Sequence, residues 1–294
     1  MKIYAICLVK NEDDIIGQSL TYATRYCDKI FIIDNGSTDR TWEIVQSLAG
    51  QYPQIVPFVQ TLERFDNGLR WLAYDAHHQE LTDSDWWMIL DGDEFLAEDP
   101  RPVIQEAMKK HADVIATSQI QFYYTDKDYE AWVAGKDNRY LPIFARRRYY
   151  RIDHRESRFF RNQSSGTWET SFLRRQLPMP PWLRSAASND PRLALTSRIG
   201  KKLRRRILNR HYQYRDPEQI EKRLKLRYGD PLFAAQVKSP EWKSVMRVST
   251  DLYYYRDGDT WHFNPSDLIS EYTGSIRYQL KNMFLRILGW LRTK

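Results

Sequence analysis

The sequence has little cysteine and no long apolar run, and each shortage excludes a class of protein. Among 294 residues there are two cysteines, Cys7 and Cys27, which lack the C-x-x-C spacing of zinc and redox sites. We expect both to be reduced packing residues. No segment approaches the roughly 20 apolar residues that span a bilayer, and the N-terminal apolar run is too short for a signal peptide. These features predict a protein that stays in the cytoplasm.

Two glycine-rich phosphate-binding motifs are also missing. Neither G-x-G-x-x-G, the signature of dinucleotide binding, nor G-x-x-x-x-G-K-[ST], the P-loop signature, occurs in the chain. Their absence argues against a dehydrogenase and against a P-loop ATPase.

Charge is distributed unevenly along the chain. Residues 1–130 carry 11 Lys and Arg against 23 Asp and Glu, whereas residues 131–294 carry 34 against 15. An acidic first part tolerates a metal site, and a basic second part suits a diphosphate, an anionic acceptor or the surface of an anionic membrane. Nucleic acid would also fit on charge alone, but no recognised binding module accompanies the basic run, so we expect no nucleic-acid partner.

The first third of the chain alternates between strand-like and helix-like segments, which is typical of an α/β domain with a largely parallel sheet. Further on, a long loop is expected over Tyr124–Arg139, and the basic run Arg198–Arg210 has the spacing of an amphipathic helix. The predicted strands are Ile3–Val9, Lys29–Asp34, Ile55–Gln60, Trp86–Leu90 and Asp113–Ile120.

Polar side chains follow several of these strands at the edge where ligands bind in open α/β sheets. They are Lys10, Asn11 and Glu12 after the first strand, Asp34, Asn35 and Ser37 after the second, and Asp91, Asp93 and Glu94 after the fourth. Helix capping accounts for one residue in each loop, not for several. Carboxylates at the end of a buried strand hold a hard divalent cation well, so the last group is a candidate metal site.

The segments LVKNEDD, FIIDNGSTDRT and WWMILDGDEF, in this order, resemble the GT-A glycosyltransferases of family 2. The resemblance covers residues 1–125 and implies a GT-A (Rossmann-like) α/β fold, with a mainly parallel sheet and helices on both faces. We expect a nucleotide-sugar-binding core at 1–125, an acceptor and catalytic-loop region of the same domain at 126–230, and a mostly helical, basic C-terminal extension at 231–294.

The resemblance also implies a reaction: metal-dependent transfer of a sugar from a UDP- or GDP-linked donor to a glycan or lipid-linked acceptor, with inversion. Inversion needs a carboxylate base, for which Glu169 in GTWETSF is expected, with Glu156, Asp153 and His154 as alternatives. Mn²⁺ or Mg²⁺ would be held by Asp91, Asp93 and His211, with His262 as the rival to the histidine. The donor would contact Asn11, Glu12, Asp34, Asp66, Arg70, Asp91 and Arg215.

Other functions and two interpretations of the C-terminal segment remain open. A sugar nucleotidyltransferase normally has a glycine-rich basic loop where this chain has the acidic LVKNEDD. A catalytically silent carbohydrate-binding protein would keep the same fold. The last helix pattern, over about residues 276–292, permits peripheral docking on an anionic membrane, and packing against the body of the protein fits it equally well.

Overall fold

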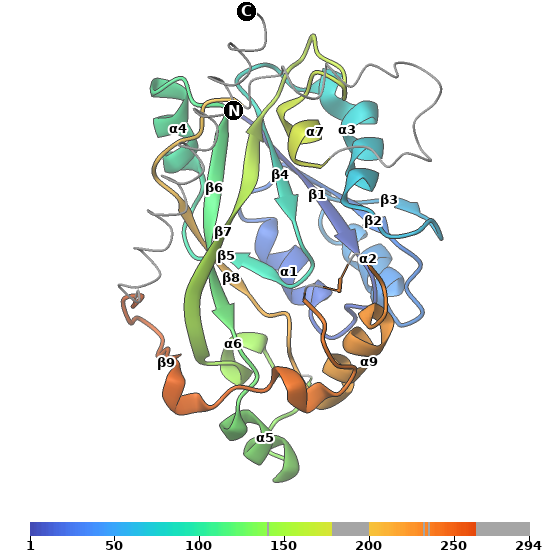
Figure 1. Ribbon diagram of the computed structural model, residues 1–294. Helices are drawn as coiled ribbons and strands as arrows, with labels where there is room; N and C mark the ends of the chain where they lie inside the picture. The colour runs from blue at the N-terminus through green and yellow to red at the C-terminus, as the bar shows by residue number, and fades with distance from the viewer. Residues whose placement is uncertain (140, 178–199, 232, 235, 263–294) are drawn as a thin grey trace, which may run out of the picture.

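The computed structural model describes residues 1–139, 141–177, 200–231, 233–234 and 236–262. Their strands belong to one sheet, in the order β3-β2-β1-β4-β7-β6-β8-β5, with β9 paired to β7 (Figure 1). The strands are β1 (Ile3–Val9), β2 (Lys29–Asp34), β3 (Ile55–Gln60), β4 (Trp86–Leu90), β5 (Glu94–Leu96), β6 (Val114–Phe122), β7 (Tyr149–Arg161), β8 (Ile207–His211) and β9 (Tyr253–Tyr254).

Parallel pairing unites the first four long strands. β3, β2, β1 and β4 run parallel, so their carboxyl ends meet at one edge of the sheet. The later strands join mostly antiparallel, with β7 against both β4 and β6 and β5 against β8, while β8 runs parallel to β6. The α/β fold is therefore confirmed, and its parallel part lies where the sequence alternates between strand and helix patterns.

Helices cover both faces of the sheet. On one face of the sheet, α1, α2 and α4 pack against every second residue of β1, beginning with Ile3. On the other face, η1, α3 and α7 pack against the intervening residues of β1, beginning with Tyr4. Cys7 and Cys27 are buried free thiols in the first of these cores, as expected. The helices are α1 (Ile16–Ala23), α2 (Thr41–Ala49), η1 (Asn67–Arg70), α3 (Trp71–His77), η2 (His78–Glu80), α4 (Arg101–Lys109), α5 (Asp126–Val133), α6 (Ile143–Arg146), α7 (Phe172–Gln176), α9 (Pro217–Arg227), η4 (Trp242–Val245) and η5 (Ser249–Asp251).

Two predictions of local structure are wrong. The basic run does not form a helix where it is described: from Ile207 it forms β8, which pairs with β6. Leu203 and Ile207 are four residues apart, a spacing that satisfies the period of a strand as well as that of a helix. The expected loop after Tyr124 contains α5, which a capping box between Thr125 and Asp128 begins.

Some predictions concern residues that the structure does not describe. Arg198 and the expected C-terminal helix, within 263–294, lie outside the described residues, so the membrane contact and the helical extension stay predictions. The division of the chain at residues 125 and 230 also stays a prediction. Within the described part of the chain, every helix is too short or too polar to cross a bilayer.

Candidate functional site

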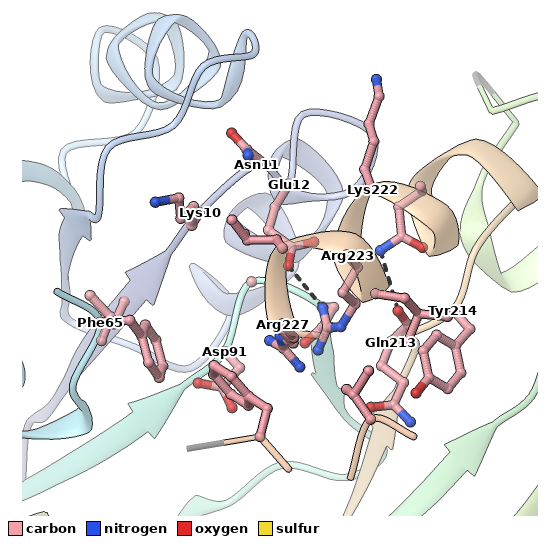
Figure 2. A pocket seen from close by; sticks show the side chains of 18 of the residues that line it. Lys10, Asn11, Glu12, Phe65, Asp91, Gln213, Tyr214, Lys222, Arg223 and Arg227 are labelled. Atoms are coloured by element: carbon pink, nitrogen blue, oxygen red, sulfur yellow. Dashed lines mark hydrogen bonds and ion pairs between the residues drawn. The ribbon is translucent and has the colours of Figure 1, made fainter. Parts of the chain in front are cut away.

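A cavity of about 1260 Å³ lies at the carboxyl ends of β1 and β4, where α9 faces them (Figures 1 and 2). It is lined by the loops after these strands and by residues of η1, β7, β8, α9 and the segment that follows α9. Nine Asp and Glu and nine Lys and Arg side chains take part in the lining. Because these charges nearly cancel, their placement decides what the cavity can bind.

The loops after β1 and β2 are tied together at the rim of the cavity. Asn11 has a positive φ of 56°, a conformation that asparagine tolerates better than most residues. Its Oδ1 accepts a hydrogen bond from the Thr38 amide (2.8 Å), and its amide donates to Ser37 Oγ (2.9 Å). The Glu12 amide donates to Thr41 Oγ1 (2.8 Å). These bonds fix Asn11 and Glu12, two of the predicted donor-binding residues, at the cavity.

Asp34 and Asp66, two of the predicted donor-binding residues, do not line the cavity but support the loops around it. Asp34 is buried, and its Oδ1 accepts a hydrogen bond from the Ser37 amide (2.9 Å), whereas its Oδ2 has no partner among the described residues. Asp66 caps η1 by accepting from the Gly68 amide (2.6 Å). That cap fixes the short helix whose last residue, Arg70, points into the cavity.

The Asp-Gly-Asp turn packs tightly against β1 and α1. A Cβ atom added at Gly92 would lie 3.1 Å from both Val9 Cγ1 and Ile16 Cδ1, so this position has almost no room for a side chain. The turn presents Asp91 to two arginines: Oδ1 lies 2.6 Å from Arg70 Nη2, and Oδ2 lies 2.8 Å from Arg158 Nη2. Both oxygens of this carboxylate therefore accept charge-assisted hydrogen bonds from guanidinium groups.

A β-bulge directs Arg158 toward this turn. The pairing of β6 with β7 passes from Ile115 opposite Phe159 to Ala116 opposite Ser157, which leaves Arg158 as the extra residue. The buried guanidinium of Arg158 contacts Asp91, Glu94 and Glu156, the last at 2.7 Å. Burial opposes its charge, but these three carboxylates raise the pKa of Arg158.

Glu94 is fully buried and shares Arg158 with Asp91. Burial raises the pKa of Glu94 to about 7, because the one guanidinium that it shares does not offset its loss of solvent and the neighbouring charge of Asp91. The amide of Gln119 donates to Glu94 Oε1 (2.9 Å). Glu94 therefore supports the base of the cavity and does not line it.

Asp93 is buried among cationic side chains. Its Oδ1 lies 3.5 Å from His211 Nε2, and its Oδ2 lies 3.6 Å from Arg223 Nη1 and 3.7 Å from Arg215 Nη1. Burial opposes ionisation, but the charges of these neighbours outweigh it and hold the pKa of Asp93 well below its usual range. His211 stands opposite Glu94 on the paired strands. Burial disfavours its charge, yet Asp93 raises its pKa.

Arg215 does not line the cavity, although the sequence places it near the diphosphate. Its buried guanidinium contacts Glu12 and both oxygens of Asp14, at 2.6 and 2.9 Å. Burial and the nearby carboxylates Asp93 and Asp14 raise the pKa of Glu12 to about 7, against the opposing charge of Arg215. Arg215 thus holds the loop after β1 in place and is not exposed to the cavity.

Two arginines that do line the cavity lie on α9. Asp216 caps this helix by accepting from the Gln219 amide (2.9 Å). Arg223 and Arg227, one turn apart on the same face, reach toward the space between Glu12 and Asp91 (Figure 2). Neither Arg158 nor these two arginines are among the residues predicted from the sequence. The four-residue spacing of Arg223 and Arg227 in a capped helix was the available signal.

The two α9 arginines differ in their partners. Arg223 contacts Glu12 (3.4 Å) and Asp93 (3.6 Å). Arg227 lies over the ring of Phe233 (4.7 Å from Cζ to the centroid) and has no carboxylate within ion-pair distance in the described part of the chain. Burial and the charge of Arg223 lower the pKa of Arg227 to about 10. Among the described residues, Arg227 is therefore a cation without a directly paired carboxylate.

The segment after β3 meets the segment after α9 across the mouth of the cavity. Arg64 Nη2 lies 3.0 Å from Asp230 Oδ1, and the rings of Phe65 and Phe233 are 6.0 Å apart. Phe65 faces the cavity (Figure 2). An aromatic face beside cationic groups suits a ligand that has both a flat ring and negative charge.

Two of the residues considered as the general base, Glu169 and Glu156, lie in different parts of the structure. Glu169 is half-exposed, lies outside the cavity and pairs with Arg174 (3.1 Å). Its segment follows Ser164, whose amide donates to Asp83 near the amino end of β4. Glu156 lines the cavity beside Arg158.

The remaining alternatives are not placed in the cavity. The side chains of Asp153 and His154 on β7 lie outside the described residues. His262 is exposed and packs near the Tyr253 ring (5.6 Å between centroids), away from the cavity lining.

The predicted metal ligands do not converge on one point. No three His, Cys, Asp or Glu side chains in the described residues are grouped closely enough to hold a metal ion. Asp91 faces two guanidinium groups, and Asp93 faces two more together with His211. The donor set implied by the family resemblance therefore does not fit a divalent cation in this arrangement, and no catalytic step is derived through one.

The family is settled by a comparison with protein-family models. The model described as Glycosyl transferase family 2 matches residues 5–175, more than half of the chain. The protein belongs to glycosyl transferase family 2. Helix α9 lies beyond the residues that the family model matches, so the α9 cations of this glycosyltransferase's cavity come from a segment outside the common family region, whereas Arg70 and Arg158 lie within it.

Solved structures with some similarity were also found, and no curated protein matched the sequence. A mannosyltransferase, PcManGT from Pyrobaculum calidifontis, in complex with GDP-Man and Mn²⁺, is 18% identical, with a TM-score of 0.32 over 41% of this chain and 35% of that one. S. aureus TarS 1–349 in complex with UDP is 14% identical, with a TM-score of 0.35 over 77% and 64%. The chain spans less than two thirds of the length of either structure.

Proposed function

We propose that this family 2 glycosyltransferase moves a sugar from a UDP- or GDP-linked donor to a hydroxyl group of a glycan or lipid-linked acceptor, with inversion. One observation carries the proposal: the loops after β1 and β4 and the cationic face of α9 line a single cavity of about 1260 Å³. A cavity of this size holds a nucleotide sugar and leaves room for part of an acceptor.

The donor would lie with its nucleoside near Asn11 and Phe65 and its diphosphate near α9. Asn11 is held at the rim by Ser37 and Thr38, and Phe65 offers the face of a ring. The sugar would then lie toward Asp91 and Arg158, on the side of the cavity where β7 contributes its residues.

We infer that Glu156, rather than Glu169, is the general base, because only Glu156 lines the cavity. Its carboxylate would take the proton of the acceptor hydroxyl as that oxygen forms a bond to the anomeric carbon. The bond from the anomeric carbon to the diphosphate oxygen breaks, and the nucleoside diphosphate leaves with the electron pair. The contact with Arg158 orients the Glu156 carboxylate toward the cavity.

A donor panel tests the proposed function. The purified protein is incubated with UDP- and GDP-linked sugars, with and without Mn²⁺, and released nucleoside diphosphate is measured by chromatography. We expect slow release from one donor through transfer to water, and faster release when a suitable glycan or lipid-linked acceptor is added. Lack of release from every donor, together with lack of binding of UDP and GDP, would contradict the proposal and favour a catalytically silent protein.

A further inference from the structure

We propose that arginines of α9, and not a divalent cation, neutralise the diphosphate of the donor in this protein. The proposal rests on the proposed function, because it concerns how the same cavity binds the same donor. It departs from the metal dependence that the family resemblance implies, and it starts from the disagreement between the predicted ligand set and the observed contacts.

The carboxylates that would hold a cation are already neutralised by the protein. Asp91 accepts from Arg70 at 2.6 Å and from Arg158 at 2.8 Å, one arginine on each oxygen. A Mg²⁺ ion bonds to its ligand oxygens at about 2.0–2.1 Å. At that distance from Asp91 the ion would lie beside two guanidinium groups, and like charges so close together repel strongly where solvent is scarce.

Asp93 offers a cation no better surroundings. It is 3% exposed and lies between His211 on one oxygen and the arginines Arg215 and Arg223 on the other. Arg215 is fully buried and bonded to two further carboxylates, so it cannot turn away without breaking these contacts. The positive charge that the family resemblance assigns to a metal is thus already supplied by side chains.

Cations that make no ion pair among the described residues also line the cavity, Lys10 in the loop after β1 and two on α9. Arg227 and Lys222 make no ion pair within the described residues, and both line the cavity with Arg223 (Figure 2). Two arginines one turn apart repel each other, and burial together with this repulsion lowers the pKa of Arg227. An anion between them would remove the repulsion. Guanidinium groups bind phosphate oxygens through paired N–H donors, so a diphosphate is a suitable anion.

This arrangement would serve the reaction as well as binding. When the bond between the anomeric carbon and the diphosphate breaks, negative charge grows on the leaving phosphate oxygen. Fixed cations beside that oxygen stabilise the charge as it develops, in the same way that a metal would. Arg223 is held by Glu12 and Asp93, so it is positioned before the donor arrives.

Calorimetric titration with UDP and with GDP tests the proposal. Each nucleotide is titrated into the wild-type protein in EDTA and again in excess Mn²⁺, and the better ligand is then titrated in EDTA into Arg223→Gln, Arg227→Gln and Lys222→Gln. The matched control is Lys110→Gln, which removes one positive charge from the end of α4, where Lys110 pairs with Glu106 outside the cavity.

We expect wild-type affinity to agree within about twofold in EDTA and in Mn²⁺. Arg227→Gln and Arg223→Gln should each weaken binding at least about thirtyfold, as truncation of a charged partner in a desolvated contact does. Lys222→Gln should weaken binding less, because its ammonium group is exposed. Lys110→Gln should bind as the wild type does.

Three results would overturn the inference, and the third would also contradict the proposed function. Binding that disappears in EDTA would restore the metal and leave the proposed function intact. Metal-independent binding that Arg223→Gln and Arg227→Gln leave unchanged would remove α9 as the diphosphate site. Failure of both nucleotides to bind under either condition would contradict the proposed function as well. Thermal unfolding of each variant without ligand separates lost binding from lost folding, and Lys222→Gln provides a surface variant that is expected to fold.

Discussion

Two groups of arginine–carboxylate contacts lie in this protein, and they differ in what surrounds them. The scaffold cluster consists of Asp137, Arg146, Arg147 and Asp216, with contacts of 2.8 Å and 2.6 Å from Asp137 to the two arginines. Each of its side chains is at most 4% exposed. The cavity cluster consists of Glu12, Asp91, Asp93, Arg158, Arg223 and Arg227, and all of its members line the cavity.

The comparison shows that ion pairs can serve two purposes in one molecule. The scaffold cluster is closed, because each arginine meets an aspartate, and it holds the start of α9 through the cap residue Asp216. The cavity cluster is open, because Arg227 has no carboxylate partner in the described part of the chain. We therefore expect damage to the first cluster to lower stability and damage to the second to lower binding or turnover.

The comparison also explains the uneven charge of the sequence. The acids of the cavity cluster come from residues 1–130, and its arginines come from later in the chain. In the scaffold cluster both signs come from the second part. Folding therefore brings the acidic first part and the basic second part of the chain together at the cavity. Opposite charges from the two parts meet there between β4, β7 and α9.

The largest effect on stability should follow from breaking the scaffold cluster. Asp137→Ala leaves Arg146 and Arg147 buried with less compensation, and loss of one partner of a buried ion pair costs about 3–5 kcal/mol. Urea unfolding should show this loss. Asp257→Ala removes an aspartate that pairs with Arg148 on the surface, and it should leave the unfolding free energy unchanged. Equal effects of the two changes would contradict the distinction.

The next effect concerns turnover. Glu156→Gln should lower kcat by about 100-fold or more, or about 2.7 kcal/mol of barrier, because a general base contributes at least that much. Donor affinity should change little. Glu169→Gln is the matched control and should keep full activity, since that residue lies outside the cavity. If only Glu169→Gln loses turnover, Glu169 and not Glu156 is the general base.

A smaller effect should appear in the pH dependence of stability. Glu12 and Glu94 have pKa values of about 7 in the fold, above the ordinary value of 4.5. A carboxyl with a raised pKa favours the folded state below its ordinary pKa, and this contribution is lost as the pH rises through the folded value. His211, whose pKa is also raised, loses its contribution above its ordinary value of 6.5, in the same direction.

The unfolding free energy should therefore fall by about 2 kcal/mol between pH 5 and pH 6, about half of it from each glutamate. Urea unfolding at four pH values measures this slope, and Glu12→Gln should flatten it. A stability that rises across this range would show that both buried glutamates stay fully ionised in the fold.

The smallest effect on stability should come from the cavity cluster. Arg227→Gln removes a cation that has no ion-pair partner within the described residues, so the unfolding free energy should change by less than about 1 kcal/mol. Thermal unfolding of the free protein measures it. A large destabilisation would place Arg227 with the scaffold residues and remove the contrast between the clusters.

Much of the fold follows from local sequence. The bounds of β1 to β4 agree with the predicted segments, because each is an apolar run that ends at polar residues. The predictions failed where local pattern allows two structures. The spacing of Leu203 and Ile207 fits a helix or a strand, and only pairing with β6 selects the strand. The capping box at Thr125 was a local signal for α5 that the sequence analysis did not use.

The site was predictable on one side of the cavity. Asn11, Glu12, Asp91 and Asp93 follow strands whose carboxyl ends must meet, so their proximity follows from the topology. The arginines that face them could not be found in this way. Arg158 depends on a bulge in a long-range strand pair, and the positions of Arg223 and Arg227 depend on where α9 packs.

A crystal structure of the protein grown with UDP and Mn²⁺, with anomalous data for manganese, tests the central claim most directly. The account predicts diphosphate oxygens within hydrogen-bonding distance of Arg223 and Arg227, and no manganese peak between Asp91 and Asp93. A manganese ion that joins Asp91 to the diphosphate, with Arg70 and Arg158 turned away, would contradict it.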